Sequence, residues 1–355
     1  MLDDIAAITR DDKYQILKTT GMLWQQCQQA WKDTQKITLP ETYQDINKIV
    51  VAGMGGSHLG AQIINAVYQP SLRFPLIVQN EYDAPGYIDE HALVIATSYS
   101  GNTEETLFFT TQALQKKAKI ICISTGGKLA EFSKEHKLPS YIFESKYNPS
   151  KIPRYGTGYL FIAQMAFLSK AGVIALSQSD VNTIIETLKN QNEKYTLKQR
   201  TADNPAKQLA KLCQEKIVVL VASQHLAGSV YVFKNQINES AKHLSVLFKL
   251  PELNHHLLEG LAHPEKNKNL LQFIFFQSDL YHERNRKRYP ITQDVVEKQG
   301  MTTAVFKATS TNHLTQAFEA LAFTSYVALY LSILNRNIGA KPNPWVNYFK
   351  EKMGE

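Results

Sequence analysis

Cysteine is scarce in this sequence, and its spacing argues against the sites that cysteine usually builds. The 355 residues include three cysteines, Cys27, Cys122 and Cys213, which lie far apart and are odd in number. Because no Cys-x-x-Cys pair is present, neither a disulfide framework nor a common zinc motif is indicated. We expect Cys122, within the run Ile-Ile-Cys-Ile, to be a buried filler. Such cysteine usage is typical of a reducing cytoplasm.

Long hydrophobic runs and a targeting signature are also lacking. No uninterrupted apolar run approaches the roughly 20 residues that cross a bilayer. The first four residues include two aspartates, where a signal peptide would be basic. We therefore expect a cytoplasmic protein with no membrane partner.

Acidic residues are outnumbered by basic ones, which gives a net charge of +7. The excess is scattered apart from residues 282–288, which we expect to form a solvated helix face or loop. Neither an aromatic-interleaved basic stripe nor a DNA-binding helical module is recognisable, so we expect no nucleic-acid partner. A basic surface also raises the local concentration of small phosphate esters.

Short apolar runs alternate with helical patterns along most of the chain. Strands buried on both faces read as continuous hydrophobic runs, and their alternation with helices predicts α/β domains with doubly wound, mostly parallel sheets. The predicted strands are Lys48–Ala52, Leu76–Val78, Ala92–Thr97, Ala118–Ser124, Lys216–Ala222, Leu270–Gln277 and Thr302–Lys307. The predicted helices are Leu59–Val67, Glu104–Lys117, Gly158–Ala171, Ala227–His243 and His313–Leu334.

A polar stretch separates two rounds of this alternation, and the length favours two domains. We predict an N-terminal helical extension (1–45), a first α/β domain (46–189), a linker (190–205) and a second α/β domain (206–355). The segments that start at Val50 and Val219 echo each other, because each runs from a strand through a small polar turn into a helix. This echo agrees with a tandem of flavodoxin-like, three-layer domains.

The first predicted strand ends in the turn Gly53–Ser57, Gly-Met-Gly-Gly-Ser. Glycines at such a turn permit positive φ and let backbone N–H groups approach a ligand, and the next helix points its positive end there. The turn lacks the Gly-x-Gly-x-x-Gly spacing of a dinucleotide site. A tight turn with Ser57 as an ordinary N-cap remains the alternative to a phosphate site.

A second polar turn, residues 97–106, ends the strand Ala92–Thr97. Ser98, Ser100 and Thr103 can donate to phosphate oxygens beside the free N–H groups of the helix start. A capping box explains one of these hydroxyls but not all three. Two such turns on neighbouring strands form the crevice where open α/β sheets bind ligands. Because no Walker lysine is present, we expect a phosphate monoester rather than a nucleotide.

Residues 98–106 closely resemble the phosphate loop of sugar isomerase (SIS) domains. Gly53–Ser57 resembles the first-strand turn of one branch of them, the bifunctional phosphoglucose/phosphomannose isomerase family. Three later segments are similar to this family's Pro-Arg…Gly-Tyr, Gln-Ile-Asn-Glu and Glu-Leu-Asn-His segments, namely Pro153–Tyr159, Asn235–Lys242 and Pro251–His256. The resemblance spans the chain from about residue 48 onward and implies two SIS domains in tandem.

The resemblance implies a role for each matching residue. The implied substrate contacts are Gly56, Ser57, Ser98, Ser100, Thr103 and Arg154. The implied catalytic residues are Glu239 as the base, His255 and Lys350 as the groups that open the sugar ring, and Arg154 as the stabiliser of the intermediate. His256 is an alternative to His255, and a small shift in alignment would select Lys341 or Lys352 instead of Lys350. A solvated pair of Glu239 with Lys242 or His243 is the ordinary alternative for that carboxylate.

The reaction that the resemblance implies interconverts glucose 6-phosphate and fructose 6-phosphate through a cis-enediol, with no metal or redox cofactor. A positioned carboxylate moves a proton between C2 and C1. The partner is thus a small sugar phosphate, and the family's shared active site implies a homodimer. Asn343 stands where many members have a threonine, so we expect mannose 6-phosphate to be the weaker substrate.

Two other functions are alternatives to this one. A non-catalytic phosphosugar sensor built from SIS domains would need none of the catalytic residues. Sensors of that kind usually carry an N-terminal helix-turn-helix domain, for which the roughly 45 residues before the first strand are too few. The isomerase half of an amide-transferring glucosamine synthase would follow a glutaminase domain with an N-terminal cysteine, whereas this sequence begins Met-Leu-Asp.

Overall fold

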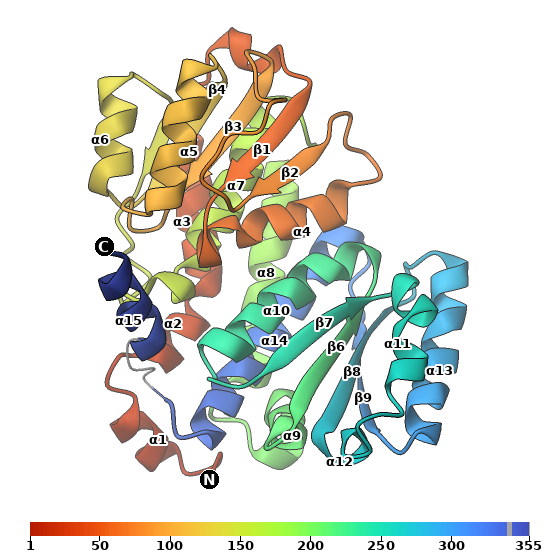
Figure 1. The fold of residues 1–355 in the computed structure, drawn as a ribbon. Coiled ribbons are helices and arrows are strands. Elements are labelled where there is room, and N and C mark those ends of the chain that lie inside the picture. The colour runs from red at the N-terminus through yellow and green to blue at the C-terminus, as the bar shows by residue number, and fades with distance from the viewer. Residues whose placement is uncertain (339–342, 355) are drawn as a thin grey trace. The chain divides into compact units, whose positions relative to one another are not determined.

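The computed structural model describes residues 1–338 and 343–354. The chain forms two compact units, each built around one parallel β-sheet (Figure 1). The first-sheet unit is Met22–Leu188, and the second-sheet unit combines Met1–Gly21 with Lys189–Glu355. The predicted α/β class with two doubly wound sheets is confirmed. The predicted boundaries of the four segments stay a prediction, and the structure groups the first 21 residues with the second sheet.

The first-sheet unit has five parallel strands in the order β2-β1-β3-β4-β5. They are β1 (Lys48–Ala52), β2 (Leu76–Gln79), β3 (Ala92–Thr97), β4 (Lys119–Ser124) and β5 (Ser140–Ile142). The strand order reverses between β1 and β3, which are paired with Val50 opposite Val94. Every residue of β3 is buried, because helices cover both faces of the sheet. The polar turns after β1 and β3 therefore meet at the topological switch point of a flavodoxin-like sheet.

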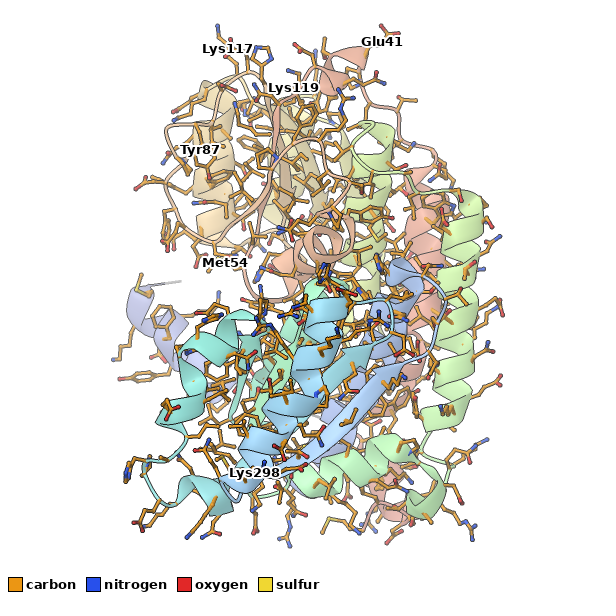
Figure 2. The ribbon with its side chains drawn as sticks, turned by 90° about the vertical axis from the view of Figure 1, so that its right-hand side faces the viewer. Glu41, Met54, Tyr87, Lys117, Lys119 and Lys298 are labelled. Atoms are coloured by element: carbon orange, nitrogen blue, oxygen red, sulfur yellow. The ribbon has the colours of Figure 1, made fainter. Side chains whose placement is uncertain are left out.

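The helices of this unit are α3 (Leu23–Thr34), α4 (Leu59–Tyr68), α5 (Glu104–Gln115), α6 (Gly127–Glu135), α7 (Thr157–Lys170) and most of α8 (Gln178–Tyr195). Parallel crossovers are right-handed, so α4 and α5, which leave the switch point in opposite directions, lie on opposite faces of the sheet. Figure 2 shows Met54 at the carboxyl edge of this sheet and Lys119, the first residue of β4, at the opposite edge. The unit thus presents its glycine-rich turn at one edge.

The second-sheet unit has four parallel strands in the order β7-β6-β8-β9. They are β6 (Ile217–Ala222), β7 (Ser245–Lys249), β8 (Leu271–Ser278) and β9 (Thr302–Ala308). Its helices are α1 (Ile5–Asp11), α2 (Ile16–Gly21), α9 (Pro205–Cys213), α10 (Ala227–Glu239), α11 (Leu257–Gly260), α12 (Asn267–Leu270), α13 (Glu283–Lys298), α14 (His313–Leu334) and α15 (Pro344–Met353).

Helix α14 is apolar on all sides and packs against both α9 and α10. Among the described residues it is the one helix long and apolar enough to cross a membrane, and 94% of its most apolar window is buried inside the protein. Such burial is that of a core helix, because a helix that faced lipid would expose its apolar side chains.

One predicted helix ends earlier in the structure. The helix predicted as Ala227–His243 ends at Glu239, because the N–H groups of Ser240 and Ala241 both bond to the Gln236 carbonyl and Lys242 has a φ of 52°. The stretch 190–205, which is predicted to connect the two domains, contains regular structure. Helix α8 continues to Tyr195, and the buried Asn204 caps α9 by accepting from the backbone of Ala206 and Lys207.

The three cysteines are buried and unpaired, as predicted for Cys122. Burial raises the pKa of the Cys122 thiol to about 12, and that of Cys213 to about 12 as well. Thiols of this kind stay protonated near neutral pH and behave as small apolar side chains.

Candidate functional site

The turn after β1 is tied directly to the end of β3. A Cβ on Gly53 would lie 2.7 Å from the Thr97 carbonyl oxygen, so only glycine permits this approach. Ser57 Oγ accepts a hydrogen bond from Tyr99 N at 3.2 Å. The N-cap of α4 is His58 rather than Ser57. Ser57 is therefore not the N-cap of α4. Its hydroxyl instead links the two turns.

The turn after β3 is organised by Ser98. Its Oγ accepts from Gly101 N at 3.1 Å and from Thr103 N at 3.4 Å, and it shares a hydrogen with Thr103 Oγ1 at 2.7 Å. Ser98 is fully buried, whereas Ser100 is exposed and accepts from Asn102 N at 3.3 Å. The three hydroxyls thus have different roles. Ser98 and Thr103 stabilise the loop through hydrogen bonds, and Ser100 is accessible to solvent.

A buried glutamine joins the two turns, and sequence reasoning missed it. Gln164 is fully buried in α7, and its Nε2 donates to Ser57 O at 2.8 Å and to Thr97 Oγ1 at 3.2 Å. The signal was available, because Gln164 is the one amide side chain in the apolar stretch 158–168. An amide buried among apolar residues needs polar partners, and here these are the two turns.

Arg154 lies beside the first turn. It sits in the short helix Pro153–Tyr155, and a Cβ added to Gly56 would be 3.8 Å from Arg154 Cα. Gln26 of α3 fixes this segment by donating to Tyr155 O at 2.9 Å. The structure therefore brings the predicted phosphate turn and the predicted active-site arginine together within one unit.

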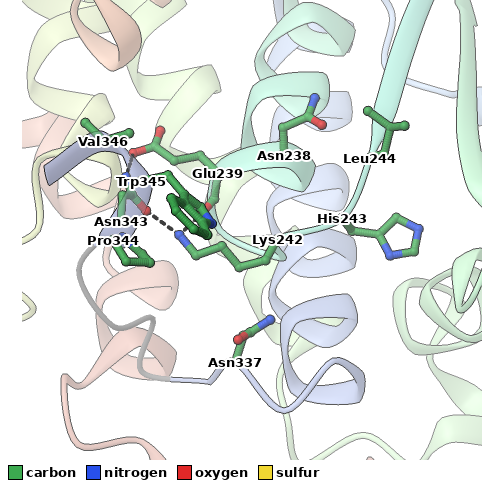
Figure 3. Close-up of a pocket in the computed structure, with 10 residues that line it drawn as sticks. All are labelled: Asn238, Glu239, Lys242, His243, Leu244, Asn337, Asn343, Pro344, Trp345 and Val346. Carbon is green, nitrogen blue, oxygen red and sulfur yellow. Dashed lines mark hydrogen bonds between the residues drawn. The ribbon is translucent and has the colours of Figure 1, made fainter. Parts of the chain in front are cut away.

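Glu239 is the last residue of α10, and it lines a cavity of about 720 Å³ in the second-sheet unit (Figure 3). The residues around the cavity are Asn238, Glu239, Lys242, His243, Leu244, Asn337, Asn343, Pro344, Trp345 and Val346. Asn343 Nδ2 donates to Glu239 Oε1 at 2.9 Å. Lys242 Nζ donates to the backbone oxygen of Glu239 at 2.8 Å. The side chain of His243 contacts Lys216 O and Asn335 instead.

The other two predicted catalytic residues lie on separate elements. Lys350 is exposed in the last turn of α15, and Asn343, which contacts Glu239, is the N-cap of that helix. Its alternative Lys352 follows in the same turn, whereas Lys341 lies outside the described residues. His255 is exposed at the end of the short helix Glu252–His255.

The structure also separates the two adjacent histidines. His256 Nε2 is 2.7 Å from Glu252 Oε2, so it is held in an exposed i,i+4 pair. Asn254, just before His255, donates to Thr292 Oγ1 at 2.8 Å and accepts from Arg288 Nη1 at 3.1 Å. The basic cluster 282–288, predicted to be solvated, is mostly exposed on α13 but supplies this one anchor.

Glu239 and His255 of one chain lie at opposite edges of the second sheet. Helix α10 ends at the amino edge with Glu239, and β7 then runs back to the carboxyl edge, where Glu252–His255 follows. The five residues of β7 span about 16 Å. The structure thus brings Asn343 and the start of α15 to Glu239, but it does not bring His255 there.

Comparison with known proteins identifies the relatives of this chain. Residues 202–353 match the model of the bacterial phospho-glucose isomerase C-terminal SIS domain, and residues 42–169 match the SIS domain model. A bifunctional phosphoglucose/phosphomannose isomerase from Caldicellulosiruptor bescii is 31% identical over 93% of this chain and 96% of its own length. The chain belongs to the bifunctional phosphoglucose/phosphomannose isomerase family.

A further member of this isomerase family and a solved structure are also similar to this chain. A member from Aquifex aeolicus is 29% identical over 86% of this chain and 88% of its own length. A solved structure of a hypothetical protein from Thermus thermophilus matches with a TM-score of 0.74 over 95% of this chain and 89% of its own, at 14% identity. That likeness concerns the fold alone. The tandem SIS architecture predicted from the sequence is confirmed.

Among residues 1–338 and 343–354, the structure contains no group of three or more histidine, cysteine, aspartate or glutamate side chains placed to hold a metal ion. The first-sheet unit supplies hydroxyls, backbone N–H groups and the Arg154 guanidinium, and the second-sheet unit supplies the Glu239 carboxylate.

Proposed function

We propose that this protein interconverts glucose 6-phosphate and fructose 6-phosphate, and that it accepts mannose 6-phosphate as a weaker substrate. The names of its relatives supply the substrate class. The observation that carries the proposal is the carboxylate of Glu239, which lines a cavity of about 720 Å³ and is held by a side-chain amide. A protein that only binds a phosphosugar has no use for an oriented base of this kind.

In this proposal, the turns after β1 and β3 bind the phosphate group. The exposed hydroxyl of Ser100 and the first N–H groups of α5 are suited to a dianionic monoester, since a helix start attracts negative charge. Ser98 and Thr103 keep the loop in shape through their mutual hydrogen bond. Gly56 and Ser57 supply the second wall of this cradle beside Arg154.

Each proton that moves in the proposed reaction has a donor and an acceptor. After His255 and Lys350 have moved a proton from the anomeric hydroxyl to the ring oxygen, the open aldose presents its C2 hydrogen. Glu239 accepts that proton while the C1 carbonyl oxygen gains negative charge, which gives a cis-enediolate. The Arg154 guanidinium stabilises this charge. Glu239 then returns the proton to C1, and the hydroxyl proton of O2 passes to O1, leaving the ketose. The reaction is redox-neutral and consumes no co-reactant.

The test is solvent exchange on the purified protein. In deuterium oxide, we expect the enzyme to convert fructose 6-phosphate into glucose 6-phosphate that carries deuterium at C2. Nuclear magnetic resonance measures this label. Glu239→Gln should reduce turnover by roughly 10² or more while the Michaelis constant changes little. Glu193→Gln, an exposed glutamate on α8 in the same unit, is the matched control and should not change turnover. Binding of the sugar phosphate without isomerisation by wild type would favour the phosphosugar sensor instead.

We further propose a homodimer in which His255 of one subunit serves the Glu239 of its partner. The position of the two residues at opposite edges of one sheet supports this, because a single proton relay needs its groups within a few ångströms. Glu239→Gln and His255→Ala proteins should each be inactive, and mixing them with subunit exchange should restore part of the activity. An active monomer in sedimentation measurements would contradict the shared site.

A further inference from the structure

The Glu239 carboxylate is held by a side chain that is itself held by a lysine. Asn343 Nδ2 donates to Glu239 Oε1 at 2.9 Å, and Lys242 Nζ donates to Asn343 Oδ1 (Figure 3). Lys242 also donates to the Glu239 backbone oxygen at 2.8 Å. All three residues line the same cavity. A lysine, an amide and a carboxylate thus form one continuous chain of hydrogen bonds.

The chemistry of the three groups sets the direction of each hydrogen bond. An ammonium group can only donate, so the Asn343 amide must turn its oxygen toward Lys242. The amide NH₂ group then faces Glu239, whose ionised carboxylate can only accept. Both neighbours therefore require the same orientation of the amide, and the ammonium group anchors it on the side away from the carboxylate. Without Lys242, the amide loses the hydrogen bond to its oxygen, so its position against the carboxylate is less fixed.

The backbone of Lys242 lets its side chain fold back onto the end of α10. Its φ of 52° lies in the left-handed region, which costs free energy for a residue with a side chain. This conformation follows directly on the end of α10 and lets Nζ return to the carbonyl of residue 239, three positions earlier.

We propose that Lys242 is a positioning residue that acts through Asn343. Lys242 holds the amide in the orientation that the carboxylate also requires, and the amide fixes the rotation of the Glu239 carboxylate. The inference rests on the proposed function, in which Glu239 is the base. Neither Lys242 nor Asn343 has to touch the sugar for this role.

A double-mutant cycle tests the proposal, with fructose 6-phosphate as the substrate. Lys242→Met should lower kcat about tenfold and change KM less than about twofold, since it removes orientation rather than substrate binding. Asn343→Ala should lower kcat at least as much, and the double variant should match Asn343→Ala, because Lys242 has nothing left to act through. Lys242→Arg, which keeps a cationic donor, should recover part of kcat. Lys211→Met, an exposed lysine on α9, is the control. Losses that add in the double variant would overturn the proposal.

A second readout does not depend on activity. The side-chain amide signal of Asn343, assigned in nitrogen–proton spectra by its loss in Asn343→Ala, should shift in Lys242→Met and stay unchanged in Lys211→Met. If the signal shifts while wild type shows no isomerase activity, the proposed function fails and the orientation by Lys242 stands. If wild type is active and the signal does not move, the positioning role fails and the proposed function stands.

Discussion

Lys207 offers the sharpest test of how the second-sheet unit is held together. Its side chain on α9 is fully buried, and its Nζ donates to the carbonyls of Leu2 at 2.9 Å, Leu197 at 3.0 Å and Gln199 at 2.7 Å. It is also 3.0 Å from Asp3 Oδ1, in a carboxylate whose side chain is 53% exposed. The ammonium group on α9 thus contacts both the first residues of the chain and the segment that follows α8.

The expected fall in the free energy of unfolding follows from the carbonyl groups that lose their hydrogen-bond donor. Lys207→Met keeps a long apolar side chain but leaves three carbonyl oxygens without the ammonium group. A buried polar group that loses its partner costs about 1–3 kcal/mol, and water reaches sites near a chain end, so we take about 1 kcal/mol for each. The free energy of unfolding should therefore fall by about 3 kcal/mol, a large part of the roughly 5–15 kcal/mol typical of a domain.

Urea unfolding followed by circular dichroism measures this loss, with native-state hydrogen exchange of the α9 amides to show where it falls, since the two units can unfold separately. Asp3→Asn is the matched control. It removes only the half-exposed carboxylate charge and should cost much less than Lys207→Met. A Lys207→Met protein within about 0.5 kcal/mol of wild type would refute the idea that this buried ammonium group anchors the three segments.

Three further predictions concern acid stability and substrate use. Burial lowers the pKa of His225 to about 4, with the stacked His313 acting in the same direction and the hydrogen bond to Gln316 opposing both. Because the unfolded chain binds a proton near pH 6.5, stability should fall by about 3 kcal/mol as the pH drops from about 6.5 to 4, and His225→Gln should remove this dependence in urea titrations across that range. Ser100→Ala should raise KM for fructose 6-phosphate more than it lowers kcat, because it removes uniform binding of the phosphate; equal activity of wild type on free fructose would contradict phosphate recognition. Asn343→Thr should raise kcat/KM for mannose 6-phosphate relative to glucose 6-phosphate, and an unchanged ratio would show that residue 343 does not control the choice of sugar.

The strands of the sheet interiors could be predicted from sequence because burial on both faces leaves a continuous apolar run. The predicted Lys48–Ala52 and Ala92–Thr97 coincide with β1 and β3. Of the four edge strands, β2 and β9 were also predicted, whereas β5 and β7 were missed. In β7 only Ser245 is buried, and β5 has three residues, so neither strand forms a continuous buried apolar run. Polar side chains in and just after the segment 190–205 are not all exposed, since Asn204 and Lys207 are buried and hydrogen-bonded.

The sequence by itself determined the family, the two rounds of α/β alternation and the turns rich in glycine and hydroxyl groups, because motifs and apolar periodicity are local properties. Only the tertiary structure decided which of those groups meet. Gln164 reaches the turns of β1 and β3 from a helix about 60 to 110 residues further along the chain, and Asn343 reaches Glu239 across 104 residues. Contacts of this kind depend on the packing of whole elements, and a side chain's own neighbours in sequence carry no record of them. The same holds for Glu239 and His255, which are sixteen residues apart in the chain yet lie at opposite edges of one sheet.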